Sequence, residues 1–220
     1  MADAFAAELV ARCQAETAAA TSENRFLELL EAGDVPRERL AWLAGEEFRI
    51  VGSDRRSFSL LAARYPDPPA GGLFLALAQG EGEALSLLLD FAAAVGMSEK
   101  DLNAYEPKPL AQAYPAYLAQ RASFGTASEV ALAMLANLEE WGAYCARAAE
   151  ALRSRYGMDE QAVGFFRFFA EPPPGFAEQA TEVVAVGLAA GDPPEEAARA
   201  ARMLHAYEGY FWNALAEDLA

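Results

Sequence analysis

The stretch LAWLAGEEFRIVGSDRRSFSLL, residues 40–61, indicates the fold most clearly. Its apolar residues recur at steps of three and four, which places them on one face of an α-helix. Glu47 and Asp54 fall on the same face, because a seven-residue step drifts by only about 20°. A buried carboxylate must be neutralised, paired or directed at a polar cavity. We therefore expect Glu47 to point inward, whereas Asp54, beside Arg55 and Arg56, either joins it or lies at a solvated edge.

The composition favours an all-α protein. Alanine is abundant, β-branched residues are sparse, and no segment alternates between apolar and polar residues over a strand length. A chain of 220 residues that is 54% hydrophobic supplies enough apolar surface for one large core. The sequence predicts one helical domain spanning residues 1–220.

The net charge and the cysteine content limit which binding partners and which cellular compartment are expected. With 17 basic and 33 acidic residues, the formal charge of −16 repels nucleic-acid phosphates and anionic lipid headgroups, so neither partner is expected. No apolar run reaches 18 residues and the start of the chain lacks a secretory pattern, which predicts a cytoplasmic protein. Cys13 and Cys145 are expected to be free buried thiols, and a lone histidine, His205, argues against a metal site or cofactor built from histidines.

Proline, glycine and capping residues predict where the helices begin and end. Helices are expected over residues 2–19, from a Ser22 cap to 31, from 36 to the proline-rich loop at 66, and over 72–95, 110–124, 126–156, 176–190 and 193–218. Residues 98–109 are expected to form a loop. Pro115 is expected to kink its helix, and either Thr126 or Ser128 caps the long helix that follows.

A third acid interrupts the apolar stripe of the last helix. Glu208 lies four residues after Leu204 and three before Phe211, so it shares their face. Two interpretations remain open for Glu208: a satisfied core carboxylate, or an acid/base with a raised pKa in a pocket. His205, one turn earlier, is expected to be packed or partly exposed rather than catalytic.

Several aromatic residues on the expected helices are candidates for a binding site. Tyr114, Trp141, Tyr207 and Phe211 either stack on a flat heterocycle or form plain core. The neighbours Glu139 and Glu140 differ by about 100° around their helix, so both cannot face inward, and Glu140 is nearer the stripe. Carboxylate di-metal bundles also need Glu-x-x-His elements, which a single histidine cannot supply twice, so no metal is expected.

Three segments resemble the TenA/thiaminase II family: GEEFRIVGSDRRSF at 45–58, PLAQAYPAYLAQ at 109–120 and HAYEGYFWNALAED at 205–218. Glu47 falls at the family's pyrimidine-binding acid, Tyr114 at its Ala-Tyr stretch, and Glu208 with Phe211 at its C-terminal Glu-x-x-Phe-Trp element. The order and spacing fit over nearly the whole chain. The resemblance implies a haem-oxygenase-like all-α fold, homotetrameric assembly, and hydrolysis of C–N bonds in thiamin or aminopyrimidines.

The chain departs from that family at the nucleophile. The family's cysteine falls at or near Asn137 in ALAMLANLEEWGAY, and a carboxamide cannot act as that nucleophile. Cys145 lies eight residues further on and cannot take the same place. A family tyrosine is replaced by Ile50, and the GFFRFFAE phenylalanines at 164–171 replace a tyrosine-tryptophan motif. Some relatives without the cysteine carry a nearby glutamate, which makes Glu140 or Glu139 a candidate replacement.

The sequence is compatible with two functions. One is a cysteine-independent hydrolase of a small heteroaromatic compound, in which Glu208 is the acid/base and Glu140 activates water. In it, Glu47 binds a ring amine while the remaining contacts come from Tyr114, Asn137, Trp141 and Phe211. The other is a ligand-binding or regulatory protein that keeps the pocket without catalysis. A haem or metal oxidase is disfavoured, since His205 lies in the last helix and haem oxygenases bind iron from the first.

Overall fold

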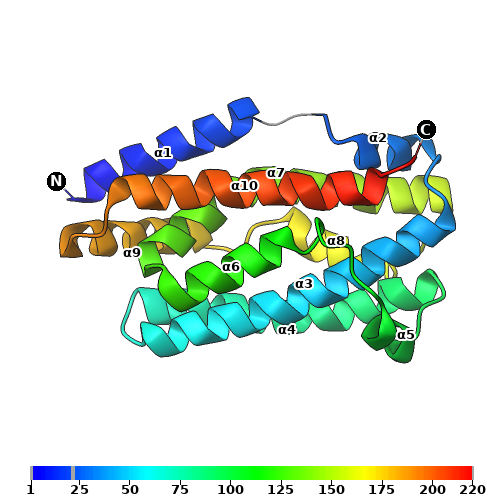
Figure 1. Cartoon of the computed structure of the whole chain (residues 1–220), viewed down its shortest axis with the longest axis horizontal. Helices are drawn as coiled ribbons and strands as arrows, with labels where there is room; N and C mark the ends of the chain where they lie inside the picture. Colours follow the sequence, from blue (N-terminus) through cyan, green and yellow to red (C-terminus); the bar gives the residue numbers. More distant parts are fainter. Residues whose placement is uncertain (1, 21–22, 220) are drawn as a thin grey trace.

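The computed structural model describes residues 2–20 and 23–219, and this part of the chain consists of helices and connecting loops without a strand. The all-α prediction is therefore confirmed. The helices are α1 (Ala2–Ala20), α2 (Arg25–Ala32), α3 (Arg37–Arg64), α4 (Ala70–Ala94), α5 (Glu99–Ala104), α6 (Ala113–Phe124), α7 (Ala127–Tyr156), α8 (Gly164–Ala170), α9 (Phe176–Ala190) and α10 (Pro194–Ala216) (Figure 1).

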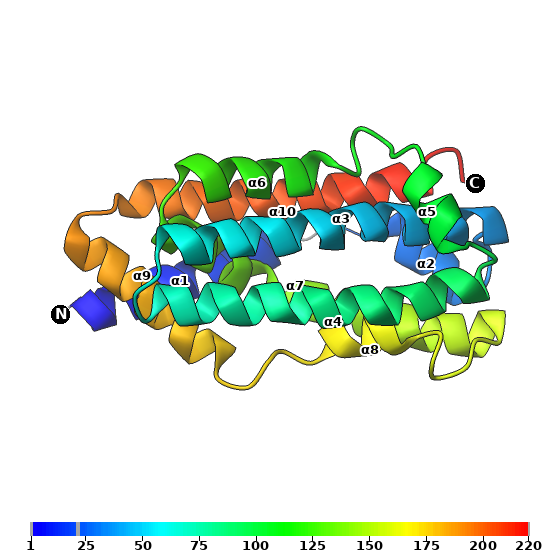
Figure 2. The same cartoon turned by 90° about the horizontal axis from the view of Figure 1, so that it is seen from below.

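Four long helices, α3, α4, α7 and α10, run along the length of the molecule (Figures 1 and 2). The most extensive helix contact joins α3 to α4, and the next joins α7 to α10. Helix α6 packs on α3 and α10, while α8 packs on α7 and α4. The two long pairs thus face each other, and α6 and α8 close the space between them from either side (Figure 2).

The buried apolar side chains form two clusters. The first joins small residues and leucines of α7, α9 and α10 to α1 and to Phe58 and Phe74. The second is aromatic, with Phe26, Phe91 and Phe166 fully buried. Each buried side chain of this size stabilises the fold by about 1.5–3 kcal/mol. Tyr114 packs against both clusters, so it marks where they meet.

Local capping explains several helix boundaries. Asn24 caps α2 by accepting a hydrogen bond from the Leu27 N–H at 3.1 Å, whereas the expected cap Ser22 lies outside the described residues. Thr126 caps α7, as one of the two predicted alternatives. Gly33 ends α2 at φ 84° and Gly157 ends α7 at φ 70°, a left-handed conformation that favours glycine.

Two local predictions were wrong. The segment 98–109 was expected to be a loop, but it contains α5, because the Ser98 hydroxyl and the Asp101 carboxylate form a reciprocal capping box. Pro115 does not kink α6, since the helix begins at Ala113 and the proline lies in the first turn, where its missing N–H is not needed. The last helix ends at Ala216, two residues before the expected end.

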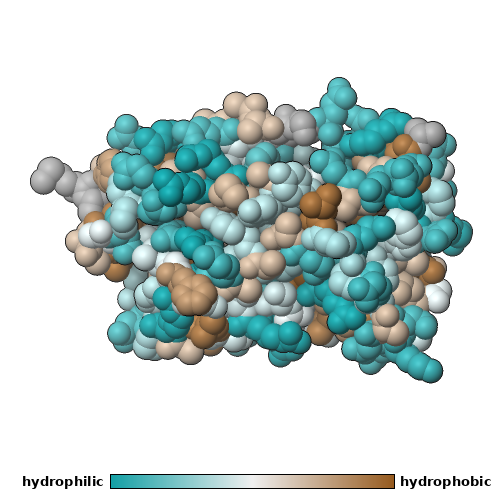
Figure 3. All heavy atoms as spheres, viewed as in Figure 1, coloured by the Kyte–Doolittle hydropathy of each residue, from teal (hydrophilic) through white to brown (hydrophobic). Residues whose placement is uncertain are grey.

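Helix α4 is long and apolar enough to cross a membrane by length and composition alone. One such helix is weak evidence for a membrane span, because core helices of soluble proteins pass the same test; α4 buries Leu73, Phe74, Leu88 and Phe91 inside this bundle, and 28% of its most apolar 18 residues are buried. The face drawn in Figure 3 is largely hydrophilic, with scattered apolar side chains. Scattered apolar residues of this kind are normal on a protein surface.

Candidate functional site

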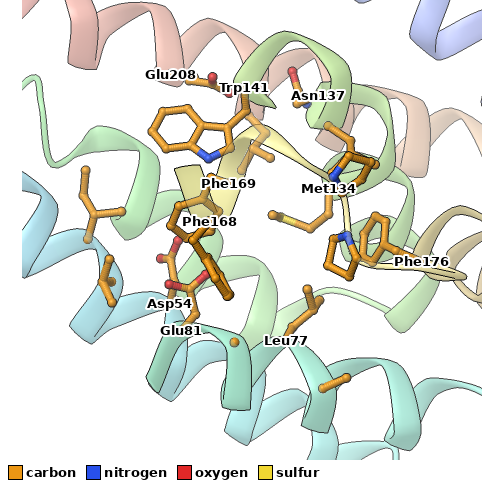
Figure 4. A pocket seen from close by; sticks show the side chains of 18 of the residues that line it. Asp54, Leu77, Glu81, Met134, Asn137, Trp141, Phe168, Phe169, Phe176 and Glu208 are labelled. Carbon is orange, nitrogen blue, oxygen red and sulfur yellow. The ribbon is translucent and has the colours of Figure 1, made fainter. Parts of the chain in front are cut away.

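A cavity of about 220 Å³ lies between the two long helix pairs (Figure 4). This volume is below the range of about 300–1,000 Å³ typical of sites for drug-sized ligands, so it suits a single-ring compound. Helices α3, α4, α6, α7 and α10 supply most of its wall, and α8, the prolines 172–174 and the first turn of α9 supply the rest. The polar or aromatic lining residues are Glu47, Asp54, Glu81, Tyr114, Asn137, Trp141, Phe168, Phe169, Glu171, Phe176, Gln179, Glu208 and Phe211.

Three of the carboxyl groups are almost completely buried. Glu47 is 1% exposed, Asp54 3% and Glu208 7%. Each has one oxygen for which the described residues offer no hydrogen-bond partner: Glu47 Oε1, Asp54 Oδ1 and Glu208 Oε1. Buried polar groups in proteins are normally hydrogen-bonded, and an unsatisfied one costs about 1–3 kcal/mol. These oxygens are therefore available to accept a hydrogen bond from a water molecule or a ligand in the cavity.

Burial also sets the protonation of these acids. It raises the pKa of Asp54 to about 8, against which a hydrogen bond from the Tyr114 hydroxyl acts. It raises the pKa of Glu208 to about 8, with a further contribution from the Glu140 charge. The pKa of Glu47 is raised well above its ordinary value by burial, then by Asp54 and Glu208. Near neutral pH the empty cavity thus favours protonated carboxyl groups.

Glu81 is a fourth acid of the cavity lining, and it is contributed by α4, which packs against α3. Its pKa is raised well above the ordinary value by burial, then by the charges of Asp54 and Glu47. Figure 4 shows its carboxyl group beside that of Asp54. The two acids therefore form a close pair on one side of the cavity.

Asn137 holds the position at which the resemblance placed a cysteine. Its side-chain amide donates to the Ala133 carbonyl at 2.8 Å and to the Ala201 carbonyl at 3.4 Å. Its Oδ1 is buried, and the described part of the chain provides no donor for it. The amide thus ties α7 to α10 and presents a hydrogen-bond acceptor rather than a nucleophile.

Aromatic rings form the apolar wall of the cavity. The Trp141 ring meets Phe169 edge-on with centroids 6.0 Å apart, and it lies 6.0 Å from Trp212. Phe168 and Phe169 meet at 5.1 Å, also edge-on. Such contacts hold the rings in place, so Trp141 and the α8 phenylalanines present fixed flat surfaces to a bound ring.

A second, smaller pocket lies on the other side of Glu208. Its lining includes Glu140, Tyr144 and His205 as well as Glu208 itself. The Tyr144 hydroxyl donates to Glu140 Oε1 at 2.7 Å, and His205 Nδ1 lies 2.9 Å from Glu140 Oε2. Glu208 therefore belongs to both pockets, and its carboxyl group separates the buried cavity from a small polar one.

The structure brings together most of the predicted site residues. The large cavity is lined by Glu47, Tyr114, Asn137, Trp141, Phe211 and Glu208. Glu140 is not part of that lining; it lies in the smaller pocket, and Glu139 is exposed. Glu81 and the phenylalanines of α8 were missed. Glu81 could have been found, because it lies four residues from both Leu77 and Leu85 and so shares their apolar face of the helix expected over 72–95.

The acids are not arranged as a metal site. Within residues 2–20 and 23–219, no three side chains of His, Cys, Asp or Glu are placed to hold one metal ion. Both cysteines are buried and free. The pKa of Cys145 is raised well above its ordinary value by burial, then by the charges of Glu47 and Glu208, which disfavours the reactive thiolate.

The helical bundle has the haem-oxygenase-like fold, as the comparison with solved structures shows. The chain aligns with a domain of unknown function with that fold from Shewanella denitrificans, at a TM-score of 0.69 and 16% identity, covering 94% of this chain and 88% of that one. A family model described as TENA/THI-4/PQQC matches residues 18–167, and the chain belongs to this family. The predicted fold and TenA resemblance are thereby confirmed.

Two further solved structures have the same fold. A TenA homologue from P. horikoshii aligns at a TM-score of 0.68 and 14% identity, covering 98% of each chain. A protein from Silicibacter described as a TenA family transcription regulator aligns at 0.69 and 18% identity, covering 99% of this chain and 97% of that one. A search of curated proteins finds no match.

Proposed function

We propose that this TenA-like protein binds a small heteroaromatic compound, of the thiamin or aminopyrimidine kind, and hydrolyses one of its C–N bonds without a cysteine. The observation that carries the proposal is the pair Glu47 and Glu208, each buried with a free carboxyl oxygen and each lining one cavity. Glu47 accepts hydrogen bonds from a ring amine, and Trp141, Phe211 and Tyr114 position the ring.

Glu208 is the acid/base in this scheme. Its carboxylate accepts a proton from a water molecule while the water oxygen bonds to the carbon that carries the leaving amine. The C–N bond then breaks, and the amine leaves with the proton that Glu208 returns. A pKa of about 8 places this group close to neutral pH, where one residue both accepts and donates a proton efficiently.

The predicted role of Glu140 changes in this proposal. Because it lies in the smaller pocket behind Glu208, it acts through the Glu208 carboxyl group rather than on substrate water. Its negative charge helps to raise the pKa of Glu208. Asn137 is a binding residue, since its free Oδ1 accepts a hydrogen bond from the ligand.

The second candidate is a binding or regulatory protein with the same cavity and no catalysis. Asn137 in place of a nucleophile favours it, and so does the Silicibacter relative described as a transcription regulator. We further propose a cytoplasmic homo-oligomer that needs no cofactor. Exposed Leu75, Leu110, Phe124 and Val186 supply apolar surface for contacts between copies.

Native mass spectrometry and a turnover assay on one panel of aminopyrimidines and thiamin analogues separate the two functions. Hydrolysis by the purified wild type supports the enzyme. Binding without turnover across the panel moves the assignment to the second candidate. If the protein shows no binding and no turnover with any compound of the panel, both candidates are refuted. Light scattering at micromolar concentration tests the assembly, since a mass of 23.6 kDa contradicts an oligomer.

A further inference from the structure

The free polar groups of the large cavity lie on two opposite sides of it. Figure 4 shows Glu208 and Asn137 on one side and Asp54 with Glu81 on the other, with Trp141, Phe168 and Phe169 between them. Glu47 lines the same cavity, and the charges of both Asp54 and Glu208 raise its pKa. The proposed hydrolysis uses Glu47 and Glu208, so it leaves Asp54 and Glu81 without a role.

Asp54 has the features of a binding group. It is 3% exposed, it lines the cavity, and its Oδ1 has no partner within residues 2–20 and 23–219. Glu81, which a different helix contributes, lies beside it (Figure 4). Two carboxyl groups facing each other across α3 and α4 repel when both are charged, so they do not explain each other as a structural ion pair.

The charge of the cavity wall selects the ligand. Five acids line it, the fifth being the exposed Glu171, and the described residues contribute no lysine, arginine or histidine to the wall. A carboxylate in such an apolar enclosure gains most from a cation that also donates hydrogen bonds. An ammonium group fits this requirement, whereas an anionic ligand such as a phosphate ester is repelled.

We propose that Asp54 and Glu81 form a second cation-binding subsite, and that the ligand carries two basic nitrogen groups joined by an apolar ring. One nitrogen binds Glu47 and Glu208, the ring stacks beside Trp141, and the other nitrogen binds Asp54 and Glu81. The inference rests on the ligand-binding cavity of the proposed function and adds a class of ligand to it. The rings between the two acid groups provide the apolar middle.

Two probes of equal ring size test the subsite: benzylamine, with one ammonium group, and 1,4-bis(aminomethyl)benzene, with two. We expect isothermal titration calorimetry at pH 7 to give at least tenfold tighter binding of the diamine to the wild type. Asp54→Asn and Glu81→Gln each abolish that preference, because a carboxamide does not attract the second ammonium group. Glu83→Gln, an exposed acid of α4 outside the lining, is the matched control and keeps it.

The number of protons released when a probe binds is a second measurement, and it would not change if Asp54 had only a structural role. Asp54 is faced by Glu47 of its own helix, Glu81 of α4 and Tyr114 of α6, and Glu208 of α10 lies on the opposite side of the cavity. Burial raises the pKa of each of these groups and favours their protonated forms near neutral pH. A bound ammonium group favours the carboxylate, so protons leave when the diamine binds. Calorimetry in buffers of different ionisation enthalpy should show more protons released by the diamine than by the monoamine, and this difference disappears in Asp54→Asn.

Equal binding of the two probes to the wild type overturns the subsite, and so does a diamine preference that survives in either folded variant. If Asp54→Asn does not fold, Glu81→Gln alone decides. The two proposals fail separately. Turnover of an aminopyrimidine without diamine preference refutes only the subsite, and diamine preference without turnover on the full panel refutes only the hydrolysis.

Discussion

Glu46 and Glu47 are neighbours on α3, both are buried, and they have opposite surroundings. Glu46 accepts hydrogen bonds from the Tyr105 hydroxyl at 2.8 Å, from the Lys108 N–H at 2.7 Å and from the Gln112 side-chain amide. Glu47 has a free Oε1 and faces other acids across a cavity. One helical step of about 100° thus separates a carboxylate that holds a loop from one that is left open.

The difference shows how to distinguish a structural acid from a binding one. Around Glu46 the packing is complete: a Cβ on Gly45 would meet the Tyr105 ring at 2.5 Å, so only glycine lets this ring lie on α3 and direct its hydroxyl at the acid. Around Glu47 the neighbours are acids and rings without donors for it. Burial is equal at the two positions, so the hydrogen-bond partners, and not burial, identify the binding group.

The largest expected effect is on catalysis at the open acids. Glu208→Gln keeps the shape of the side chain and removes the titrating group, so turnover should fall by about 10²–10⁴-fold. Binding should change much less, because the cavity wall is unaltered. Steady-state kinetics with titration calorimetry measures both, and Glu139→Gln on the exposed face of α7 is the control. Unchanged turnover in Glu208→Gln contradicts the carboxylate mechanism.

The next effect is on stability, at the satisfied acid. Glu46→Ala leaves three donors without their acceptor, and we expect a loss of about 2–4 kcal/mol in the free energy of unfolding. Glu47→Gln should instead leave stability unchanged or raise it, because a carboxamide avoids the cost of keeping this buried carboxyl group protonated at pH 7. Urea unfolding of both variants at pH 7 compares them. Equal destabilisation would abolish the distinction between the two acids.

A smaller effect is expected from pH. Asp54 and Glu208 have pKa values of about 8 in the folded protein, against ordinary values of 3.8 and 4.5. Between these limits the folded state binds more protons than the unfolded state, so stability should fall as pH rises from about 5 to 8. Glu208→Gln should make this decline shallower. Denaturant unfolding at several pH values tests the sign, and a rise in stability over this range contradicts it.

The smallest expected effect is at the cysteines. Cys145 is fully buried, and the proposed mechanism uses no thiolate. Iodoacetamide treatment of the native protein, Cys13→Ser and Cys145→Ala should each leave turnover per folded molecule unchanged. Circular dichroism verifies the fold in each case. Inactivation of a well-folded Cys145→Ala protein would assign the chemistry to the thiol instead.

The sequence predicted the helices well because their signals are local. The stripe of α3 placed Glu47 correctly, and the stripe of α10 placed Glu208. The prediction for Glu140 was less accurate. Helical spacing put Glu140 near an inward-facing stripe, but in the structure it lines the smaller pocket behind Glu208. Whether Asp54 faced solvent or cavity depended on α4 and α6 packing against it, and no local pattern encodes such contacts between distant helices.

The segment of three consecutive prolines, 172–174, forms one part of the cavity wall that no helix provides. Proline has no N–H, so this strip exposes no backbone donor that a ligand or a neighbour must satisfy. Its ends are fixed by α8 and α9, and the Pro173 carbonyl accepts a hydrogen bond from the Phe176 N–H at 3.1 Å. Insertions or substitutions here can change the ligand accepted by the cavity while the helical framework and its acids stay in place. Evolution of specificity in this protein is therefore expected to act first on this strip.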